Sequence, residues 1–535
     1  MRLRLLLACL VLLPVAASAQ IVLDGEVQDD GSSFLLLPFT VPDGTVEIEV
    51  RHDDLSAANI LDWGLWDPNG FRGWGGGNGE PAIVGARASS RSYTAGPLPA
   101  GEWHVVVGKA QITERPARYH VEIDLRSTPT LAAQSERMPY AAAAALETGP
   151  RWYAGDFHVH SVESGDARPP IDEIATFARG RGLDFVLLSD HNTNSQVDFL
   201  AGAQARHPAL LLIPGVEFTT YAGHANGIGV TRYVDHRLGV DGVTIEGALD
   251  ALHAQGGLVS INHPVLDLGD LCIGCAWAHD VAADRIDAIE IATGGWRQSS
   301  FLFTPRAIDF WDARCATGRH LAAIGGSDDH RAGVDLGATG SPIGDPTTMV
   351  YASELSAGGI VDAVRAGRTV VRLQGPGDPM LELTANDAMV GDTVDAPQVT
   401  LRARVTGGAG TRLRFVHNGE RLSAVPVASD PFETTLVVSA PYLASGPDRW
   451  RAELVEGRDL RVVTSHVWIA PQPGSPPDAG LDAGSMDGST SGSMDASADA
   501  SAEASPAGCG CRTTRGPLAP AQAFFALLVL LARRR

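Results

Sequence analysis

The residues of this sequence with the clearest chemical potential are the two histidines of the hexapeptide GDFHVH, which ends at His160. Successive side chains of a β-strand point to opposite faces, so His158 and His160 would leave the same face of a strand. Two imidazoles side by side at a strand end suit a metal ion, although an isolated His-x-His pair is more often two unrelated surface residues. Whether the pair binds a metal therefore depends on whether later residues of the chain supply more ligands.

Further ligand-type side chains stand where apolar, strand-like runs end, for example after FVLLS (185–189) and LAAIGG (321–326). These side chains are Asp166, Asp190, His191, Glu217, His224, His263, Asp328 and His330. In an α/β barrel the carboxyl ends of the parallel strands converge on one mouth. Each residue alone could cap a helix or pack in a turn, but the whole set favours a metal centre. Asp190 could be a ligand or could fix the neighbouring His191 ring by a hydrogen bond.

Residues 131–374 alternate strand-like runs with amphipathic stretches at 171–181, 244–255, 305–317 and 354–366. This alternation predicts an α/β fold, either a barrel or an open sheet, with helices covering parallel strands. Residues 20–130 and 375–470 instead show short alternating runs broken by Gly, Pro and Asp, which predict a β-sandwich on each side. Four tryptophans of the first sandwich could form a carbohydrate platform, although core packing is the commoner use of such residues.

The two ends of the chain predict export. Residues 1–19 have the layout of a secretory signal peptide, with an apolar run too short to span a bilayer. Residues 471–507 are mostly Pro, Gly, Ser, Ala and Asp, which predicts a disordered acidic linker. Residues 508–535 contain two cysteines, an apolar run and three terminal arginines. A buried helix is the alternative, but this order favours a sorting or membrane-anchor segment.

The net charge of −22 argues against nucleic-acid binding, which normally needs a basic face. Cys272 and Cys275 are separated by two residues, and Cys315 stands alone. A zinc knuckle would need a second pair, so the spacing in an exported protein favours a disulfide between Cys272 and Cys275 over two free thiols.

The ordered motifs FHVHSVESGD, SDHNT, PGVE, GHANGIG, INHP and GSDDH resemble the polymerase-and-histidinol-phosphatase (PHP) family, and more narrowly its secreted branch related to carbaryl hydrolase. The resemblance covers about residues 150–372. It implies a distorted (β/α)7 TIM-like barrel between the two sandwiches, with two or three divalent zinc, manganese or iron ions. The C-terminal tail similarly resembles the myxobacterial C-terminal sorting domain, which implies a place at the cell surface or outer membrane.

Carried onto this sequence, the resemblance implies three groups of ligands. One metal would take His158, His160, Glu217 and Asp328; a second would share Glu217 and take His224 and His263; a third would take Asp166, His191 and His330. A metal-bound water would then be the nucleophile, with no nucleophilic side chain. Arg168 and Arg331 stand close to ligands and could hold a phosphate, or could pair with neighbouring aspartates.

These patterns favour a secreted metal-dependent hydrolase that acts on a small phosphoester. Two alternatives stay open. A carbamate or carboxyl ester hydrolase fits the same centre, and a non-catalytic surface protein could use a degenerate barrel as a scaffold. The sequence does not determine the oligomeric state.

Overall fold

The computed structural model describes residues 19–473 except 29, 270–271, 337–339 and 443–445. The predicted signal peptide, acidic linker and anchor segment therefore lie outside the described residues, apart from Ala19 and residues 471–473. Contacts between residues group the described residues into one compact unit, so the domain boundaries within it stay predictions. Among the described residues, no helix is both long enough and apolar enough to cross a membrane.

The N-terminal strands form two antiparallel sheets, ordered β1-β8-β3-β6 and β2-β7-β4-β5. Their bounds are β1 (Ala19–Glu26), β2 (Phe34–Val41), β3 (Glu47–Asp53), β4 (Ile60–Asp67), β5 (Gly70–Gly76), β6 (Ala82–Gly85), β7 (Gly101–Gln111) and β8 (Arg118–Arg126). Side chains from both sheets share one core, in which Trp103, Ile48 and Val121 are fully buried. The other three tryptophans, Trp63, Trp66 and Trp74, are buried as well, so none of the four offers an exposed platform.

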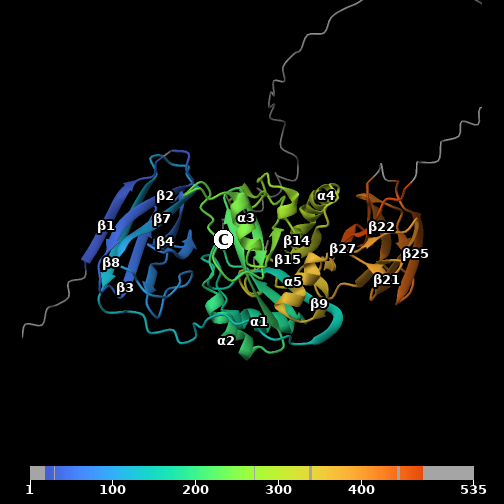
Figure 1. Ribbon diagram of the computed structural model, residues 1–535, viewed down its shortest axis with the longest axis horizontal. Helices are drawn as coiled ribbons and strands as arrows, with labels where there is room; N and C mark the ends of the chain where they lie inside the picture. The colour runs from blue at the N-terminus through green and yellow to red at the C-terminus, as the bar shows by residue number, and fades with distance from the viewer. Residues whose placement is uncertain (1–18, 29, 270–271, 337–339, 443–445, 474–535) are drawn as a thin grey trace, which may run out of the picture. The chain divides into compact units, whose positions relative to one another are not determined.

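The central segment alternates strands and helices, and all five α-helices of the described residues belong to it (Figure 1). Its elements are β9 (Thr148–Val159), α1 (Ile171–Gly180), β10 (Phe185–Leu188), α2 (Val197–Arg206), β11 (Leu211–Thr220), β12 (Gly223–Ile228), α3 (Ile245–His253), β13 (Leu258–Ile261), β14 (Ala288–Thr293), α4 (Thr304–Cys315), β15 (Ala322–Gly326), β16 (Thr347–Glu354), α5 (Ala357–Arg365) and β17 (Thr369–Arg372). Strands β9, β10 and β11 pair in parallel, as do β13, β14 and β15. The hairpin strand β12 joins the two sets by antiparallel pairing.

Strands β15 and β9 approach each other where both end. The amide of Asp328 donates to the His158 carbonyl at 2.9 Å, and the amide of His160 donates to the Asp329 carbonyl at 3.0 Å. Gly326 is required here, because a Cβ at this position would lie 2.2 Å from the Cβ of His158. Within the described residues, an isolated parallel bridge, Val159 with Asp329, links the strands. The structure therefore shows a mixed α/β segment, and closure into a (β/α)7 barrel stays a prediction.

The central sheet continues without a break into the C-terminal strands, because β17 pairs with β27. The remaining strands are β18 (Met380–Ala385), β19 (Ala388–Met389), β20 (Thr393–Val394), β21 (Gln398–Thr406), β22 (Arg412–His417), β23 (Glu420–Arg421), β24 (Val425–Pro426), β25 (Phe432–Ser439), β26 (Asp448–Glu456), β27 (Asp459–Thr464) and β28 (Val467–Ile469). A separate antiparallel sheet, β19-β18-β21-β25, contributes Leu383 and Leu401 to a core shared with Leu454 of β26.

Candidate metal centre

Strand β9 delivers two histidines to one place. Its last seven residues, from Tyr153, are all buried, because neighbours pair on both sides of the strand. The rings of His158 and His160 lie 5.1 Å apart between centroids, and both residues are 0% exposed. The Nδ1 atom of His158 lies 2.8 Å from Glu290 of β14, which leaves its Nε2 atom to face the other candidate ligands.

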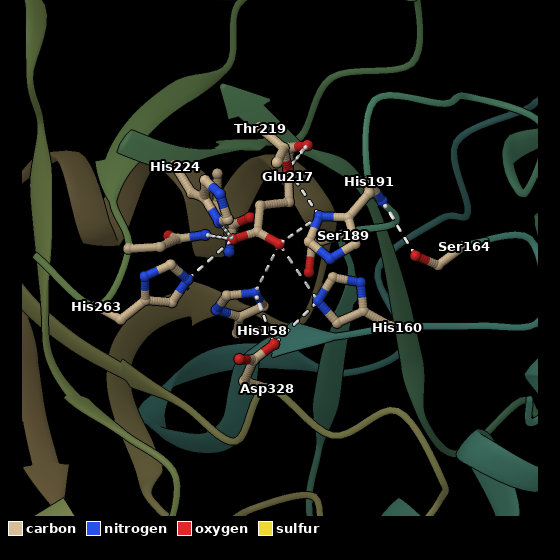
Figure 2. Close-up of polar contacts among 12 residues, drawn as sticks. His158, His160, Ser164, Ser189, His191, Glu217, Thr219, His224, His263 and Asp328 are labelled. Atoms are coloured by element: carbon tan, nitrogen blue, oxygen red, sulfur yellow. Dashed lines mark hydrogen bonds and ion pairs between the residues drawn. The ribbon is translucent and has the colours of Figure 1, made fainter. Parts of the chain in front are cut away.

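The carboxylate of Glu217 lies at the centre of the cluster (Figure 2). Its Oε2 atom is 3.3 Å from Nε2 of His158, 3.4 Å from Nε2 of His160 and 2.9 Å from Nδ1 of His191. Its Oε1 atom is 3.3 Å from Nδ1 of His224 and 3.2 Å from Nε2 of His263. One carboxylate therefore touches five imidazoles, which come from four separate regions of the chain.

The short spacing between Glu217 and His224 results from a tight hairpin. The sequence places His224 in a loop, whereas the structure places it in β12, paired with Thr219 of β11. Residues 217 and 219 share one face of β11, and directly paired residues of antiparallel strands share a face as well. Glu217, Thr219 and His224 therefore point to the same side, so seven residues of chain suffice to bring two candidate ligands together.

Asp328 completes a group of four with His158, His160 and Glu217. Its Oδ1 atom lies 3.3 Å from Nε2 of His158 and 3.1 Å from Nε2 of His160. One ligand atom from each of the four residues lies within 4.8 Å of all the others. For donors about 2.1 Å from zinc, neighbouring donors are about 3.4 Å apart in a tetrahedron and about 3.0 Å apart in an octahedron. The observed separations fit donors arranged around one cation.

Several buried atoms in the cluster have no hydrogen-bond partner. They are Nε2 of His158, Nδ1 of His160, Oε2 of Glu217 and both ring nitrogens of His224. Unpaired buried polar atoms are costly, and most native proteins contain few of them. Imidazole nitrogens and carboxylate oxygens are common donors to zinc, manganese and iron. The donor set therefore fits divalent cations.

The protonation of the cluster follows from the same crowding. Burial alone would raise the pKa of Glu217, but the facing rings of His158 and His191 hold it well below its usual value. Burial would lower the pKa of His158, but the surrounding carboxylates raise it well above its usual value. Protons thus supply the positive charge that the carboxylates require, and bound cations would supply the same charge.

A third group lies on the more exposed side of the cluster. Oδ2 of Asp166 is 3.4 Å from Nε2 of His191 and 3.2 Å from Nε2 of His330, so the three residues assigned to the third metal are together. The side chain of Asp166 is 56% exposed, whereas those of His158 and His160 are 0% exposed. The side formed by Asp166, His191 and His330 is therefore the more exposed side of the cluster.

The carboxylate of Asp190 binds Ser161 and does not contact the ring of His191. Its carboxylate accepts hydrogen bonds from the amide and hydroxyl of Ser161 at 2.6 and 2.8 Å. The Nδ1 atom of His191 instead contacts Thr219 Oγ1 at 2.7 Å and Glu217 at 2.9 Å. Burial raises the pKa of Asp190 to about 7, against the effect of the bonds from Ser161. Asp190 therefore fixes the segment that follows β9.

The two arginines considered for phosphate binding are both exposed. The amide of Arg168 donates to the His330 carbonyl at 3.2 Å, which ties its loop to the third group. The guanidinium of Arg331 donates to the backbone carbonyl of Asp335 at 2.6 Å. Neither arginine makes the ion pair with a neighbouring aspartate that the sequence allowed, as far as the described residues show.

Four further residues support the centre although the sequence does not predict them as ligands. Glu290 contacts His158, and the side-chain amide of Asn262 donates to Oε1 of Glu217 at 2.9 Å. Asp156 accepts hydrogen bonds from the amides of Ser327 and Gly344 and so joins β9 to the segments around β15. Asp156 is part of the hexapeptide, Asn262 follows β13 and Glu290 lies within β14. Only the polarity of these residues distinguishes them from their apolar neighbours in the sequence.

The fourth, Cys275, is 1% exposed and forms a disulfide with Cys272. Its carbonyl oxygen lies 3.0 Å from Nδ1 of His263.

Two candidate ligands, His263 and Asp328, have φ angles of 28° and 56°, in the left-handed region. Strained backbone of this kind persists where the surrounding structure imposes it, and it is common at functional sites.

Comparisons with known proteins give limited information. No family model matches the chain, and no curated protein matches it. Among solved structures, a two-domain protein from Bacteroides vulgatus, described as containing a predicted PHP-like metal-dependent phosphoesterase, is 20% identical, with a TM-score of 0.35, over 63% of this chain and 100% of its own. A Parabacteroides merdae β-glucuronidase is 11% identical, with a TM-score of 0.16, over 83% of this chain and 64% of its own. At these TM-scores neither likeness establishes the fold or the activity of this chain.

Proposed function

We propose that this protein is a metal-dependent hydrolase that acts on a phosphoester at a centre of two or three divalent cations. The observation that carries the proposal is the central Glu217 carboxylate, which faces five imidazoles while buried donor atoms of His158, His224 and Glu217 itself make no hydrogen bond. The three groups of ligands are those implied by the resemblance to the PHP family, which also supports the barrel fold.

Bound divalent cations would polarise the scissile group and lower the pKa of a coordinated water, for zinc from about 15.7 towards 7. The side chains of this protein would hold and orient the reactants. Glu290 fixes the ring of His158 through Nδ1, so that Nε2 is the donor atom. The more exposed groups Asp166 and His330 border the side from which substrate can approach.

No nucleophilic side chain is needed in this scheme. Ser260, which the sequence places within a strand, is buried in β13 and 0% exposed. The central segment contains no G-x-S-x-G motif of the serine hydrolases. These observations favour direct attack by water.

The test uses the full chain loaded separately with zinc, manganese or iron and assayed on aryl phosphates, phosphodiesters and aryl carbamates. We expect turnover of at least one phosphoester that is lost in the His158→Ala, His160→Ala double variant and retained in a His120→Ala control on the N-terminal strand β8. Turnover of carbamates or carboxyl esters alone would overturn the phosphoester assignment. Bound metal without any turnover would favour a binding protein.

We also propose that the chain is exported and held at the cell surface or outer membrane through residues 508–535. The support comes from the composition of the two ends alone, which lie outside the described residues. Fractionation of cells that express the full chain and a chain shortened at residue 507 tests this. Release of only the shortened chain is expected, and equal distribution of both would overturn the anchor.

A further inference from the structure

Cys275 lies against the part of the centre formed by His224 and His263. Its sulfur and one ring nitrogen from each histidine lie within 4.8 Å of one another, and all three residues are buried. The Cys275 carbonyl lies 3.0 Å from Nδ1 of His263, so this carbonyl accepts the Nδ1 proton and leaves the Nε2 lone pair for a cation. Cys275 therefore contacts this group twice. Its carbonyl orients the ring of His263, and its sulfur lies beside the ring nitrogens of His224 and His263.

The environment of His224 points to a cation at the same place. His224 is 4% exposed, and neither of its ring nitrogens makes a hydrogen bond. An imidazole buried without a hydrogen bond is costly unless another partner occupies a lone pair. Imidazole nitrogen and cysteine thiolate are both common zinc ligands. The three residues thus have the chemistry of a metal site as well as its dimensions.

The sulfur of Cys275 is nevertheless bonded to Cys272, with Cα atoms 5.6 Å apart. The thiolate is the form of cysteine that binds metals, so a sulfur in a disulfide is a poor ligand. The same atom therefore serves either the disulfide or the metal site. Which of the two it serves depends on the redox state of the pair.

We propose that the Cys272–Cys275 pair makes the His224–His263 metal site redox-sensitive, a proposal that rests on the proposed function. With the disulfide closed, the site has two imidazoles and Glu217 and keeps a position open for water or substrate. With the disulfide reduced, the Cys275 sulfur becomes an additional ligand. Structural zinc sites are closed by four protein ligands, whereas catalytic sites keep one position open. Reduction therefore strengthens metal binding at this site and slows turnover.

The chemistry of the step is balanced by a dithiol reductant. The dithiol gives up two electrons and two protons and closes to its own disulfide, while the S–S bond breaks and both cysteines become thiols. The Cys275 thiol then loses its proton to solvent as its sulfur binds the cation. Reoxidation of the pair reverses both steps.

Cobalt(II) tests the proposal without a turnover assay, because a thiolate bound to cobalt gives a strong charge-transfer absorption in the near ultraviolet. The experiment uses the full chain with Cys509→Ser and Cys511→Ser, so that the tail offers no thiol. A trialkylphosphine serves as reductant, since it does not supply a competing thiol; it takes an oxygen atom from water and becomes the phosphine oxide. The charge-transfer band is expected to appear on reduction, with the visible bands of bound cobalt present in both states.

Two matched variants decide the assignment. Cys272→Ser leaves the Cys275 thiol permanently free, so the band is expected without reductant. Cys275→Ser removes the ligand and is expected to bind cobalt without the band in either state. Cys315→Ser, which changes the buried free cysteine of α4, is expected to behave like the parent chain. Bound cobalt without the band in Cys272→Ser would overturn this inference and leave the proposed function standing. Failure of every variant to bind cobalt would overturn both.

Discussion

Glu290 shows how a side chain that is not a candidate ligand can determine how well a cation is held. It lies in the middle of β14, is 0% exposed, and contacts Nδ1 of His158 at 2.8 Å. Carboxylates that hold a ligating histidine fix its orientation and raise its basicity, and losing one typically weakens metal affinity about 10–100-fold.

We therefore expect Glu290→Gln to weaken metal binding by about 10–100-fold, with a folded chain. The measurement is the dissociation constant from competition with a chromophoric chelator. Glu433→Gln, on an exposed face of β25, is the matched control and should change nothing. Equal affinity of Glu290→Gln and the parent chain would show that Glu290 does not support the ligand.

At the scale of single residues, the nine candidate ligands could be predicted because most of them are polar residues at or just after the ends of apolar runs. The structure brings all nine into one cluster, although metal binding itself stays a proposal. The role of Glu290 could not be predicted, because a carboxylate within an apolar strand has no position that marks its role. The partner of Asp190 could not be read either, since adjacency in sequence does not determine which way a buried carboxylate turns.

Helix α4 is attached to the C-terminal strands by a buried charge network. Asp312 of α4 accepts a hydrogen bond from Arg451 of β26 at 2.9 Å, and Arg451 is 0% exposed. The Asp312 carboxylate also lies 3.1 Å from Nε2 of His466. Burial would raise the pKa of Asp312, but hydrogen bonds and charge from His466 and Arg451 lower it.

Removal of one partner of a buried ion pair typically costs about 3–5 kcal/mol, and the lower end applies here because Arg451 also pairs with Glu453. Asp312→Ala is therefore expected to lower the free energy of unfolding by about 3 kcal/mol, measured by urea denaturation. Asp309→Ala on the same helix is the control, because Asp309 is 69% exposed and lies 4.0 Å from its nearest arginine. A loss as small as that of the control would mean that the network does not stabilise the helix.

Among the elements, the strand-like runs and four of the five helices could be predicted from periodicity. Helix α2 was missed because its small residues, such as Gly202, give a weak amphipathic pattern, although Leu200 and Ala203 are buried. For the hairpin β11–β12 the sequence predicts only a strand over 210–218 followed by a loop, because Tyr221 and Ala222 alone connect the two strands. No pattern in so short a turn distinguishes a hairpin from a loop.

The N-terminal sheets contact the loop that carries Asp166. Ser92 donates from its amide and its hydroxyl to Glu163, at 3.1 and 2.8 Å, and Arg91 donates to the Ala167 carbonyl at 2.8 Å. Gly165 also packs closely against this part of the chain, because a Cβ at residue 165 would lie only 2.1 Å from the carbonyl oxygen of Gly75. The N-terminal sheets therefore help to shape the exposed side of the candidate metal centre.

The continuous pairing of β17 with β27 has no signal in the sequence. The composition changes near residue 375, where the sequence predicts a boundary, but backbone pairing between distant strands leaves no local mark. The domain boundary near residue 375 therefore stays a prediction.

His236 makes the attachment of the N-terminal sheets sensitive to acid. Its ring is 2% exposed and lies 4.4 Å from the ring of Trp74 and 5.8 Å from that of Phe34. Burial lowers the pKa of His236 from 6.5 to about 3. Below pH 6.5 the unfolded chain therefore binds a proton that the folded chain does not, and stability falls as the pH falls towards 3.

Between pH 6.5 and 5 this group is expected to cost about 2 kcal/mol of stability. His236→Phe, which cannot titrate, should lessen the fall in melting temperature over that interval, whereas His104→Phe on β7 should not. Parallel pH profiles for the parent chain and His236→Phe would contradict the assignment.

The number of metal ions per folded chain tests the central claim most directly. The full chain, loaded with zinc, manganese or iron and freed of excess metal by gel filtration, is analysed by elemental mass spectrometry. At least two ions per chain are expected, falling by at least one in the His158→Ala, His160→Ala variant and unchanged in His120→Ala. A folded parent chain that retains no metal under any loading condition would contradict the account.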